Sequence, residues 1–445
     1  MNPYSAGDDA AASAALATVE PASVRLRKHR PDAEPPVTPY APEACQEVLN
    51  RVPKSLRGMD LLKGVAKALR SLDEGPRASI TLHLEALVRH MTHIDASDLD
   101  MGGDSCRGNV WYRIHGDKKP HGKLGNYSPA ECNVFFLNML SEVQTMNLLK
   151  NYAVDFSYQL QAGKDNGEWH RFRMTIYFDN DNLALNVRSI TNELRDLESL
   201  GFHPTIQKGL LFEHVRDGLT LVTGVTGSGK STTLDAIVDA NNRRTPGHIV
   251  IIGEPIEFMH ASKRCIVRHR EVGKDVGSFS DGVVQSLRQD PDIIVIGEMR
   301  DPKTISAAIE VTDSGHKVFS TLHTSSAIES VARIVGEYAT EEQERIRYRL
   351  ADVLRCIISQ KLLPTTSGGR IMAKEVLWVT PSVRAAIKSN NVNEIYQMMW
   401  EGRAQGQVTL EQDLAMLLKA GKISSETAMN YANNKKRLQQ ILGMA

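Results

Sequence analysis

A glycine-rich loop between a predicted strand and a predicted helix is the feature that most constrains this fold. Residues 224–231 read G-V-T-G-S-G-K-S, which fits the pattern G-x-x-x-x-G-K-[ST]. A short apolar strand is predicted at 219–222, and a helix follows the loop with Leu234, Ile237 and Val238 on one side. In this order, backbone N–H groups and the positive end of the helix converge on one point. The sequence therefore predicts a phosphate-binding loop.

The loop and the residue after it form the candidate nucleotide site. Lys230 is expected to reach the β and γ phosphates of ATP, and the hydroxyl of Ser231 is expected to bind Mg²⁺. ATP and Mg²⁺ are thus the expected ligands. The site takes in Gly224, Val225, Thr226, Gly227, Ser228, Gly229, Lys230, Ser231 and Thr232.

After the loop, apolar runs alternate with helical segments. The runs at 249–252, 293–296 and 318–322 are continuous, as expected for parallel strands that are buried on both faces. Asp301 and Pro302 suit the N-cap and first position of a helix, and Gly315 is a plausible stop. This alternation predicts a parallel sheet with right-handed crossovers.

Acidic residues follow two of these strands. Glu298 comes after the run at 293–296, and Glu254 and Glu257 come after the run at 249–252. Ligands of open α/β sheets bind beyond the carboxyl ends of the strands, so these acids are expected near the nucleotide. Glu298 is expected to hold the Mg²⁺ water shell or to polarise the attacking water. Glu254 and Glu257 are candidates for the general base or for metal contact, although ordinary loop acids would look the same.

Two histidines bracket the predicted strand at 318–322. His316 precedes it and His323 follows it, so the two should lie at opposite ends and should not share a metal ion. His323 is expected at the phosphate end, where it would sense the γ-phosphate or contact a neighbouring subunit. The alternative for a lone histidine is a purely structural role.

A hairpin is predicted upstream of the loop. Residues 171–178 and 183–188 alternate apolar and polar side chains on either side of a run of turn formers at 179–182. With Phe178 opposite Leu183, Arg173 lies directly opposite Arg188, and Arg171 shares that face. Facing like charges are unfavourable unless an anion lies nearby, so this face predicts an anionic neighbour.

Composition limits the other classes of function. Lysine plus arginine equals aspartate plus glutamate, at 53 each, so no net charge draws the chain to nucleic acid or to an anionic membrane. No run approaches the roughly 20 apolar residues that span a bilayer, and no signal peptide is predicted. The five cysteines are widely spaced with no C-x-x-C pair, which argues against a disulfide scaffold or a tetracysteine zinc site.

We predict five segments along the chain. Residues 1–77 are expected to be a flexible proline-rich tail with a basic cluster at Arg25, Arg27, Lys28 and Arg30, residues 78–190 a mixed α/β domain, and residues 191–215 a linker with helical pieces. Residues 216–370 are expected to be the nucleotide-binding domain, and residues 371–445 a helical C-terminal region.

Several segments together resemble the secretion and pilus motor ATPases, especially the PilT-like branch that includes type IV secretion ATPases. The resemblance runs from about residue 96 to about residue 433. Its most specific parts are the segments T-G-V-T-G-S-G-K-S-T-T-L at 223–234, L-R-Q-D-P-D-I-I-V-I-G-E-M-R-D at 287–301 and G-H-K-V-F-S-T-L-H-T-S-S-A at 315–327. Shorter matches lie at A-S-D-L-D (96–100), D-F-S-Y (155–158), R-F-R (171–173) and Q-K-L-L-P (360–364).

The resemblance implies an α/β subunit with a PAS-like N-terminal domain and a RecA-like P-loop ATPase domain, assembled as a homohexamer. ATP would lie between the two domains. It implies that Glu298 is an atypical Walker B acid, that Glu254 and Glu257 belong to an aspartate box, and that His316 and His323 belong to a histidine box. Arg171, Arg173 and Arg188 would match N-domain arginines that contact nucleotide phosphates, and the pattern does not say which is an arginine finger.

One departure concerns the aspartate box, which in PilT-like proteins usually reads I-E-D-P-I-E and here reads I-G-E-P-I-E. Gly253 replaces one carboxylate, so Glu254 and Glu257 stay open as the general base. The absence of a tetracysteine motif favours the retraction-like or type IV secretion branches over the extension branch.

The expected function is ATP hydrolysis that drives a type IV pilus, secretion or conjugation machine through inner-membrane components. The expected location is the cytoplasm, peripherally at the inner membrane. Two alternatives stay open: a nucleic-acid translocase, against which the neutral charge argues, and a regulatory subunit that binds ATP without turnover, which the altered aspartate box favours.

Overall fold

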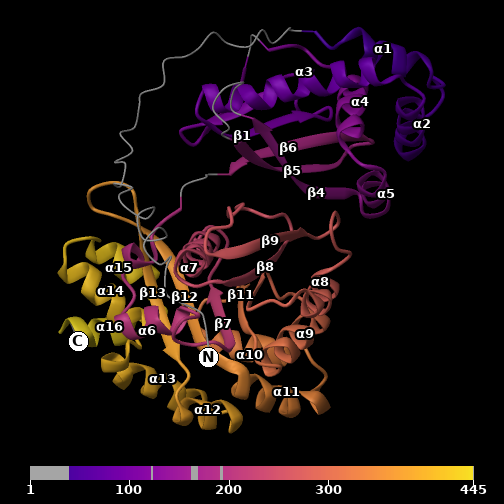
Figure 1. The fold of residues 1–445 in the computed structure, drawn as a ribbon. Helices are drawn as coiled ribbons and strands as arrows, with labels where there is room; N and C mark the ends of the chain where they lie inside the picture. The colour runs from indigo at the N-terminus through magenta and orange to yellow at the C-terminus, as the bar shows by residue number, and fades with distance from the viewer. Residues whose placement is uncertain (1–39, 122–123, 162–168, 191–193, 444–445) are drawn as a thin grey trace, which may run out of the picture.

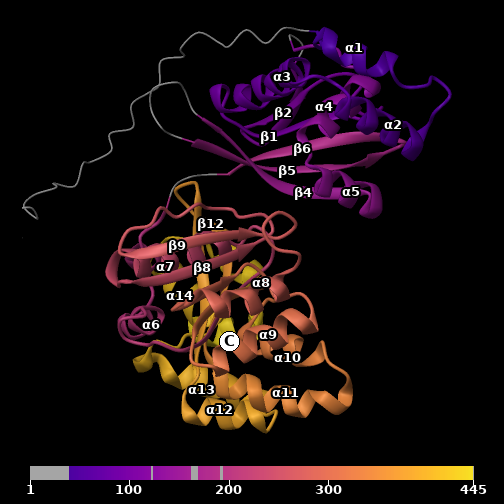
Figure 2. The ribbon, with the colours of Figure 1, turned by 45° about the vertical axis from the view of Figure 1, so that its right-hand side comes forward.

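The computed structural model describes residues 40–121, 124–161, 169–190 and 194–443, which form two α/β units joined at 191–193. Figures 1 and 2 show the N-terminal unit lying above the C-terminal unit, with β4 and α5 on its lower side. The predicted basic cluster at 25–30 falls outside the described residues. Among the described residues, no helix is long and apolar enough to cross a membrane.

The N-terminal unit is built on a six-stranded antiparallel sheet in the order β3-β2-β1-β6-β5-β4. Its buried face carries alternate residues such as Phe172, Met174 and Ile176, which pack with the long helix α3 and with α4. The strands are β1 Ala96–Gly102, β2 Trp111–Ile114, β3 Asp117–Pro120, β4 Ala153–Gln161, β5 Trp169–Asp179 and β6 Asn182–Ile190. The helices are α1 Glu43–Asn50, α2 Gly58–Arg70, α3 Glu74–His93, α4 Pro129–Met139 and α5 Glu142–Asn151.

The predicted hairpin register is confirmed. Phe178 pairs with Leu183, and Arg173 pairs with Arg188, across the β5–β6 ladder. The alternation of apolar side chains determines this register, because a slip of one residue would turn the apolar set out of the core.

The predicted tail boundary at residue 77 is wrong for residues 43–77. These residues form α1, α2 and the start of α3, and Cys45, Val48, Leu62 and Val65 are buried in the core of the N-terminal unit. The prolines and charged residues upstream hid this amphipathic pattern. The α/β unit therefore begins at about α1, well before residue 78.

The C-terminal unit contains a seven-stranded sheet in the order β13-β12-β7-β11-β10-β8-β9. Six strands are parallel, and β13 pairs antiparallel with β12 at one edge. The predicted strands at 219–222, 249–252, 293–296 and 318–322 are confirmed. The strands are β7 Gly218–Thr223, β8 Gly247–Gly253, β9 Cys265–Glu271, β10 Ile293–Ile296, β11 Lys317–Leu322, β12 Leu354–Pro364 and β13 Arg370–Trp378.

Helices cover both faces of this sheet. One face packs with α8 and its neighbours through Val250 and Ile252, and the other packs with α6 and α7 through Ile249. The predicted cap is confirmed, since Asp301 accepts from the N–H groups of the first turn of α9. The elements are η1 Leu197–Leu200, α6 Pro204–Leu210, α7 Lys230–Arg244, α8 Phe279–Ser286, η2 Leu287–Gln289, α9 Pro302–Asp313, α10 Ala327–Gly336 and α11 Thr340–Val353.

The predicted domain boundary at residue 370 is also wrong. β13 starts at Arg370 and continues the sheet of the nucleotide-binding domain, so this domain extends to about Trp378. The physical reason is that β12 would otherwise be an edge strand with unpaired N–H and C=O groups. The segment after β13 is helical as predicted, with α12 Pro381–Lys388, α13 Val392–Glu401, η3 Gly402–Gln405, α14 Leu410–Lys419, α15 Ser425–Tyr431 and α16 Lys435–Leu442.

Candidate functional site: a phosphate loop at the sheet edge

The glycine loop joins the end of β7 to the start of α7. Gly224, Gly227 and Gly229 have φ angles of +147°, +79° and +87°, a region that side chains with a Cβ rarely adopt. A Cβ on Gly224 would lie 2.5 Å from the carbonyl oxygen of Gln360 and 2.5 Å from Ser228 Oγ. The glycines are therefore needed both for the turn and for the close approach of β12.

The interior of the loop suits an anion. Lys230 Nζ donates to the carbonyl oxygens of Gly224, at 2.8 Å, and Val225, at 3.2 Å, so its charge lies inside the loop. Burial lowers the pKa of Lys230, and the nearby charges of Glu298 and Glu257 oppose that shift. Ser228 Oγ is buried with no hydrogen-bond partner among the described residues. A phosphate would supply the missing partner, so the residues fit the expected nucleotide.

Gln360 on β12 supports the loop from the next strand. Its Nε2 donates to the carbonyl oxygen of Ser228 at 2.8 Å, and its Oε1 accepts from Thr233 Oγ1 at 2.9 Å. These two bonds hold the loop against the first turn of α7. The sequence analysis did not single out Gln360, although it begins the segment Q-K-L-L-P.

Two predicted residues meet beside the loop at neighbouring strand ends. Glu298 follows β10, His323 follows β11, and these strands are adjacent and parallel. His323 Nε2 lies 3.2 Å from Glu298 Oε1, and Arg300 Nη2 lies 2.7 Å from Glu298 Oε2. Burial raises the pKa of Glu298, but Arg300 and His323 outweigh burial, so the net pKa of Glu298 is lowered. Glu298 is thus ionised and held by two basic side chains.

Arg300 is a site residue that the sequence analysis missed. It pairs with Glu298, and that bond raises its pKa, with further help from the charges of Glu254 and Asp155. Asp155 belongs to β4 of the N-terminal unit, so Arg300 feels charges from both units. Its position two residues after Glu298 was the available signal.

The two acids that follow β8, Glu254 and Glu257, are exposed and lie near this cluster. The charge of Glu257 acts on Lys230, and the charge of Glu254 acts on Arg300. At Gly253 an added Cβ would lie 2.8 Å from Ile256 Cδ1 and 3.2 Å from the carbonyl oxygen of Pro255. A side chain at position 253 would require a local shift, which gives a packing reason for the glycine. Glu254 and Glu257 both stay candidates for the general base.

The metal role predicted for Ser231 and Glu298 rests on their positions. Ser231 lies in the first turn of α7, and Glu298 lies at the end of β10, two strands from β7. The ionised carboxylate and the hydroxyl are oxygen donors that Mg²⁺ prefers. No cluster of three or more histidine, cysteine or acidic side chains among the described residues forms a protein-only metal site. Mg²⁺ would therefore need oxygens from the nucleotide and from water, as is usual for this ion.

His316 lies away from the loop. It precedes β11, at the end of the strand opposite to His323, and its Nδ1 lies 3.0 Å from Ser314 Oγ and 3.1 Å from the carbonyl oxygen of Val311. These contacts tie it to the end of α9. His316 and His323 therefore lie at opposite ends of β11, as predicted, and the place of His316 in a histidine box stays a prediction.

The facing arginines have the predicted anionic neighbours within their own unit. Arg188 Nε donates to Asp98 Oδ1 at 2.9 Å, and Arg173 Nη2 lies 3.9 Å from Asp155 Oδ2. Asp98 and Asp155 therefore offset the repulsion between the two arginines. The paired charges do not by themselves require a phosphate.

Arg171 instead lies close enough to the C-terminal unit to feel its charges. Its side chain is buried, and its Nε and Nη1 have no hydrogen-bond partner among the described residues. Burial lowers its pKa, and the charges of Glu271 on β9 and Asp235 on α7 oppose the shift. Arg171 therefore lies within electrostatic reach of β9 and α7 of the nucleotide-binding domain.

Glu271 forms the hydrogen-bonded link between the two units. Its carboxylate accepts from Ser157 N at 3.1 Å and from Ser157 Oγ at 2.5 Å, and it also accepts from Ile256 N at 3.4 Å. Ser157 lies on β4 directly opposite Arg173. The basic face of the N-terminal sheet is therefore held next to β9.

Comparisons with known proteins agree with this geometry. The family of type II/IV secretion system proteins matches residues 177–405. A twitching motility protein of Neisseria gonorrhoeae is 38% identical over 323 residues, which are 72% of this chain and 84% of that protein. A type IV pilus retraction ATPase, PilT, of Pseudomonas aeruginosa is 37% identical over 313 residues, which are 69% of this chain and 88% of that protein.

Solved structures give the same result for the fold. The pilus retraction motor PilT with bound ADP superposes with a TM-score of 0.69 at 34% identity, covering 80% of this chain and 98% of that one. The ATPase DotB of Legionella pneumophila superposes with a TM-score of 0.68 at 24% identity, covering 82% and 96%. Given its glycine loop, its strand-end acid and histidine and these similarities, the chain belongs to the family of type II/IV secretion system proteins.

Proposed function

We propose that this chain is an ATPase motor of a type IV pilus or type IV secretion machine, hydrolysing ATP to ADP and phosphate. One observation carries the proposal: Lys230, Glu298 and His323 lie close together at the carboxyl ends of neighbouring parallel strands. The similarity to PilT, a type IV pilus retraction ATPase and a retraction motor solved with bound ADP, supports it. The finer assignments of a RecA-like and a PAS-like domain belong to the same proposal.

Each site residue has a part in the proposed reaction. Lys230 would turn from the loop carbonyls to the β and γ phosphates, and the glycine loop would hold the phosphate oxygens with its N–H groups. Ser231 and Glu298 would hold Mg²⁺, which supplies neutralisation of phosphate charge when it is bound. Because Glu298 is ionised, it suits this role, and His323 lies where it would report on the terminal phosphate.

The attacking water needs a general base, and two acids compete for that role. The charge of Glu257 raises the pKa of Lys230, and the charge of Glu254 raises the pKa of Arg300. Both acids therefore lie within electrostatic reach of the site. The proton of the water would pass to one of these carboxylates as the water oxygen bonds to the γ-phosphorus and the bond from that phosphorus to the bridging oxygen breaks, with ADP as the leaving group. Measuring hydrolysis in Glu254→Gln and Glu257→Gln separates them, because only loss of the base slows the chemical step strongly.

The motor part of the proposal concerns the two units and neighbouring copies. Arg171, Arg173 and Arg188 lie on the N-terminal sheet beside the nucleotide-binding domain, so a change at the ATP site would alter their contacts. We propose assembly as a homohexamer at the cytoplasmic face of the inner membrane, working on inner-membrane components. Sedimentation velocity with and without ATP tests the ring, and a monomer at all concentrations would contradict it.

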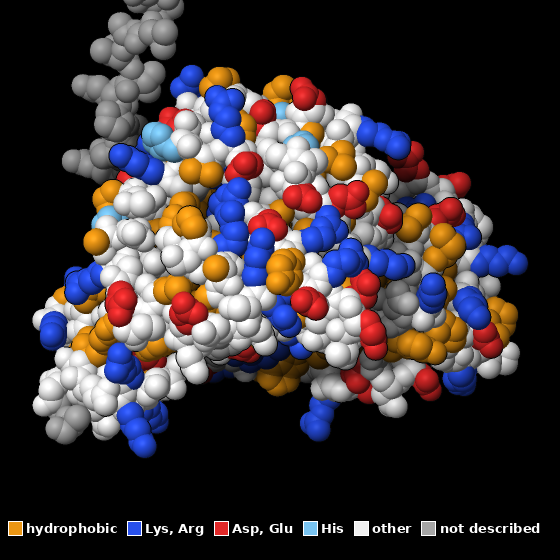
Figure 3. Space-filling model, turned by 90° about the horizontal axis from the view of Figure 1, so that it is seen from below, with side chains coloured by type: hydrophobic (Ala, Val, Ile, Leu, Met, Phe, Trp, Pro, Cys, Tyr) orange, Lys and Arg blue, Asp and Glu red, His pale blue; other side chains and the backbone are white. Residues whose placement is uncertain are grey.

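Direct nucleic-acid binding has less support. The chain has no net charge, and on the face seen in Figure 3 basic and acidic side chains are interspersed. A salt-sensitive affinity for DNA in a filter-binding titration would revive the translocase alternative. Steady-state phosphate release likewise separates the motor from a regulatory subunit that binds ATP without turnover.

The first test replaces the lysine of the loop. Lys230→Ala removes the cation inside the phosphate cradle, and we expect ATP binding to weaken and turnover to fall by at least about a hundredfold. Lys274→Ala, at an exposed lysine beyond β9, is the matched control. Normal turnover in a folded Lys230→Ala protein would disprove the proposal.

The second test replaces the strand-end acid. Glu298→Gln keeps the shape of the side chain but removes its charge, so we expect ATP to bind while hydrolysis slows by about a hundredfold or more. Single-turnover hydrolysis and nucleotide binding are measured side by side. An unchanged single-turnover rate would remove Glu298 from the mechanism, while Glu329→Gln on α10 serves as the control.

A further inference from the structure

A second basic pocket lies on the opposite side of the sheet from the helix that follows the glycine loop. It is an open groove of about 420 Å³ at the edge strand β9, lined by His248, Arg268, His269, Arg270, Asp275 and Gln289. Its floor is the face that packs with α8, whereas α7 packs on the other face. The groove is therefore separate from the candidate ATP site.

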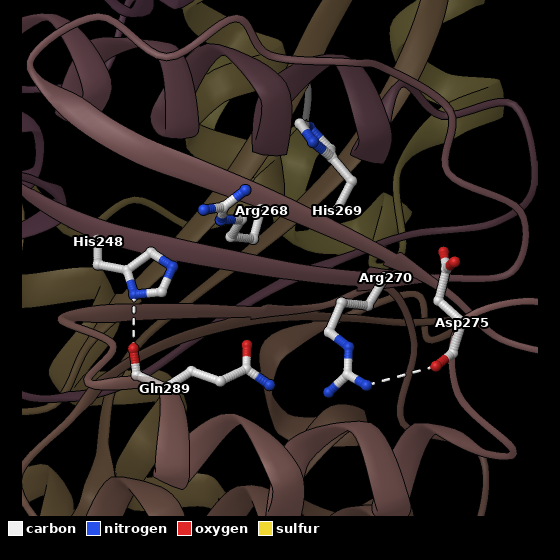
Figure 4. Close-up of a pocket in the computed structure, with 6 residues that line it drawn as sticks. All are labelled: His248, Arg268, His269, Arg270, Asp275 and Gln289. Carbon is white, nitrogen blue, oxygen red and sulfur yellow. Dashed lines mark hydrogen bonds between the residues drawn. The ribbon is translucent and has the colours of Figure 1, made fainter.

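The strand register brings two arginines to this groove. Arg268 and Arg270 lie two residues apart on β9, so they project to the same side, and they pair with Val250 and Ile252 of β8. Arg268 is exposed. Figure 4 shows the two guanidinium groups and the imidazole of His248 around one opening.

Arg270 is fixed by two hydrogen bonds and has one nitrogen without a hydrogen-bond partner among the described residues. Its Nη2 donates to Gln285 Oε1 at 2.8 Å and to the carbonyl oxygen of Asp275 at 3.3 Å. Its Nη1 is buried and has no hydrogen-bond partner among the described residues. A buried donor without a partner is unfavourable, so this nitrogen is suited to an acceptor that enters the groove.

The carbonyl groups around His248 define its tautomer. Nδ1 lies 2.8 Å from the carbonyl oxygen of Gln289 and 3.3 Å from that of Asp290, and carbonyl oxygens only accept, so Nδ1 carries the proton. In the neutral ring, Nε2 is then an acceptor. It too is buried and without a partner among the described residues.

The groove thus offers donors from two arginines and one acceptor from His248. Arg270 Nη1 and the guanidinium of Arg268 suit the oxygens of an anion, and His248 Nε2 suits an O–H group. Asp275 does not neutralise this set fully, because the two arginines carry two positive charges and its carboxylate carries one negative charge. We infer that this groove binds inorganic phosphate, which carries anionic oxygens and keeps an O–H group at neutral pH.

The O–H group separates inorganic phosphate from similar anions. Sulfate has no O–H group, and neither does the dianion of a phosphomonoester, which is the main form above its second pKa of about 6. Both would leave Nε2 of the neutral His248 ring without a donor. The groove is therefore expected to prefer free phosphate to sulfate or to a phosphorylated molecule.

The test must exclude the glycine loop, which also fits phosphate. We would titrate the full-length Lys230→Ala protein with inorganic phosphate at about pH 8 by calorimetry, and repeat this with sulfate and with methyl phosphate, whose dianion has no O–H group. A loop site would be lost in this protein, whereas the groove would be kept. Wild-type protein saturated with ADP and Mg²⁺ provides a second way to occupy the loop.

We expect one phosphate per chain in the Lys230→Ala protein, weakened at least about tenfold by adding Arg268→Gln, whose exposed side chain leaves folding intact. Arg270→Gln should weaken it at least as much, and Arg333→Gln on α10 is the matched control. Sulfate and methyl phosphate should bind at least about tenfold more weakly than phosphate. No saturable phosphate binding, no effect of Arg268→Gln, or equal binding of sulfate would overturn the inference.

Discussion

At the scale of single residues, the ionisation of Glu298 depends on its two basic neighbours. Burial would raise its pKa, but Arg300 at 2.7 Å and His323 at 3.2 Å lower it below the usual value. A carboxylate with a lowered pKa keeps its charge as the pH falls. Glu298 should therefore stay ionised well into the acid range.

Replacing Arg300 tests this dependence. In Arg300→Gln the pKa of Glu298 rises, because burial is no longer fully opposed, so the acid limb of the pH–rate profile for hydrolysis should move to higher pH. Arg300→Lys should largely restore the limb, since it keeps the charge. The profile of Arg333→Gln, at an exposed arginine paired with Glu337, should match the wild type. If the acid limb of Arg300→Gln stays at the pH of the wild type, the ionisation of Glu298 does not determine that limb.

Single residues also show the limits of the sequence analysis. Glu298 and His323 were predictable, since each follows an apolar strand and parallel strands share an edge. Gln360 and Glu271 were not, because their partners lie elsewhere in the chain: Gln360 donates to the carbonyl oxygen of Ser228, and Ser157 donates to Glu271. The sequence around these residues does not indicate such distant partners.

At the scale of elements, the buried start of β11 is an unusual feature. Lys317 is fully buried, and its Nζ donates to the carbonyl oxygens of Gly209, at 2.9 Å, and Val215, at 2.8 Å. These bonds join β11 to α6 and to the linker that follows it. Burial lowers the pKa of Lys317 from 10.5 to about 7, with a small opposing effect of Asp217.

The lowered pKa makes stability depend on pH. Between about pH 7 and pH 10.5 the unfolded chain binds a proton at Lys317 that the folded chain lacks, so the free energy of unfolding should rise with pH, by up to about 1.4 kcal/mol per unit. Lys317→Met should remove this rise. The measurement is urea denaturation of both proteins across that range.

The control for this experiment is Lys419→Met, at an exposed lysine in the last turn of α14. It should leave the pH dependence of the wild type in place. If wild type and Lys317→Met show the same dependence, then Lys317 stays charged in the folded protein, held by its two carbonyl acceptors.

At the scale of the whole molecule, one carboxylate links the two α/β units. Glu271 on β9 accepts two hydrogen bonds from Ser157 on β4, and Arg171 lies beside it. Figures 1 and 2 show β4 on the lower side of the N-terminal unit, above β9 of the C-terminal unit.

Removing the link should loosen the two units. Hydrogen bonds to a charged group contribute about 1.5–3 kcal/mol, so Glu271→Ala should shift the docking equilibrium at least about tenfold towards separated units. Small-angle X-ray scattering of the nucleotide-free protein should show a larger radius of gyration. Ser157→Ala, which keeps the backbone N–H, should have a weaker effect.

Glu337→Ala is the matched control for the domain link. Glu337 lies at the C-terminal end of α10, where it pairs with Arg333. If Glu271→Ala leaves both the scattering profile and the hydrogen exchange of β4 unchanged, the units are held by other contacts. The Glu271 link would then have no role in their movement.

The sequence by itself determined the glycine loop, the parallel strands and the facing arginines. These depend on local rules: glycine allows positive φ, continuous apolar runs make buried strands, and alternation sets the register of a hairpin. The tertiary structure alone decided that α1 and α2 belong to the N-terminal unit and that β13 belongs to the nucleotide-binding sheet. It also decided that Arg171 faces Glu271 and that His248, Arg268 and Arg270 share a groove. Contacts between distant segments arise from packing and long-range charge, which no local pattern of residues encodes.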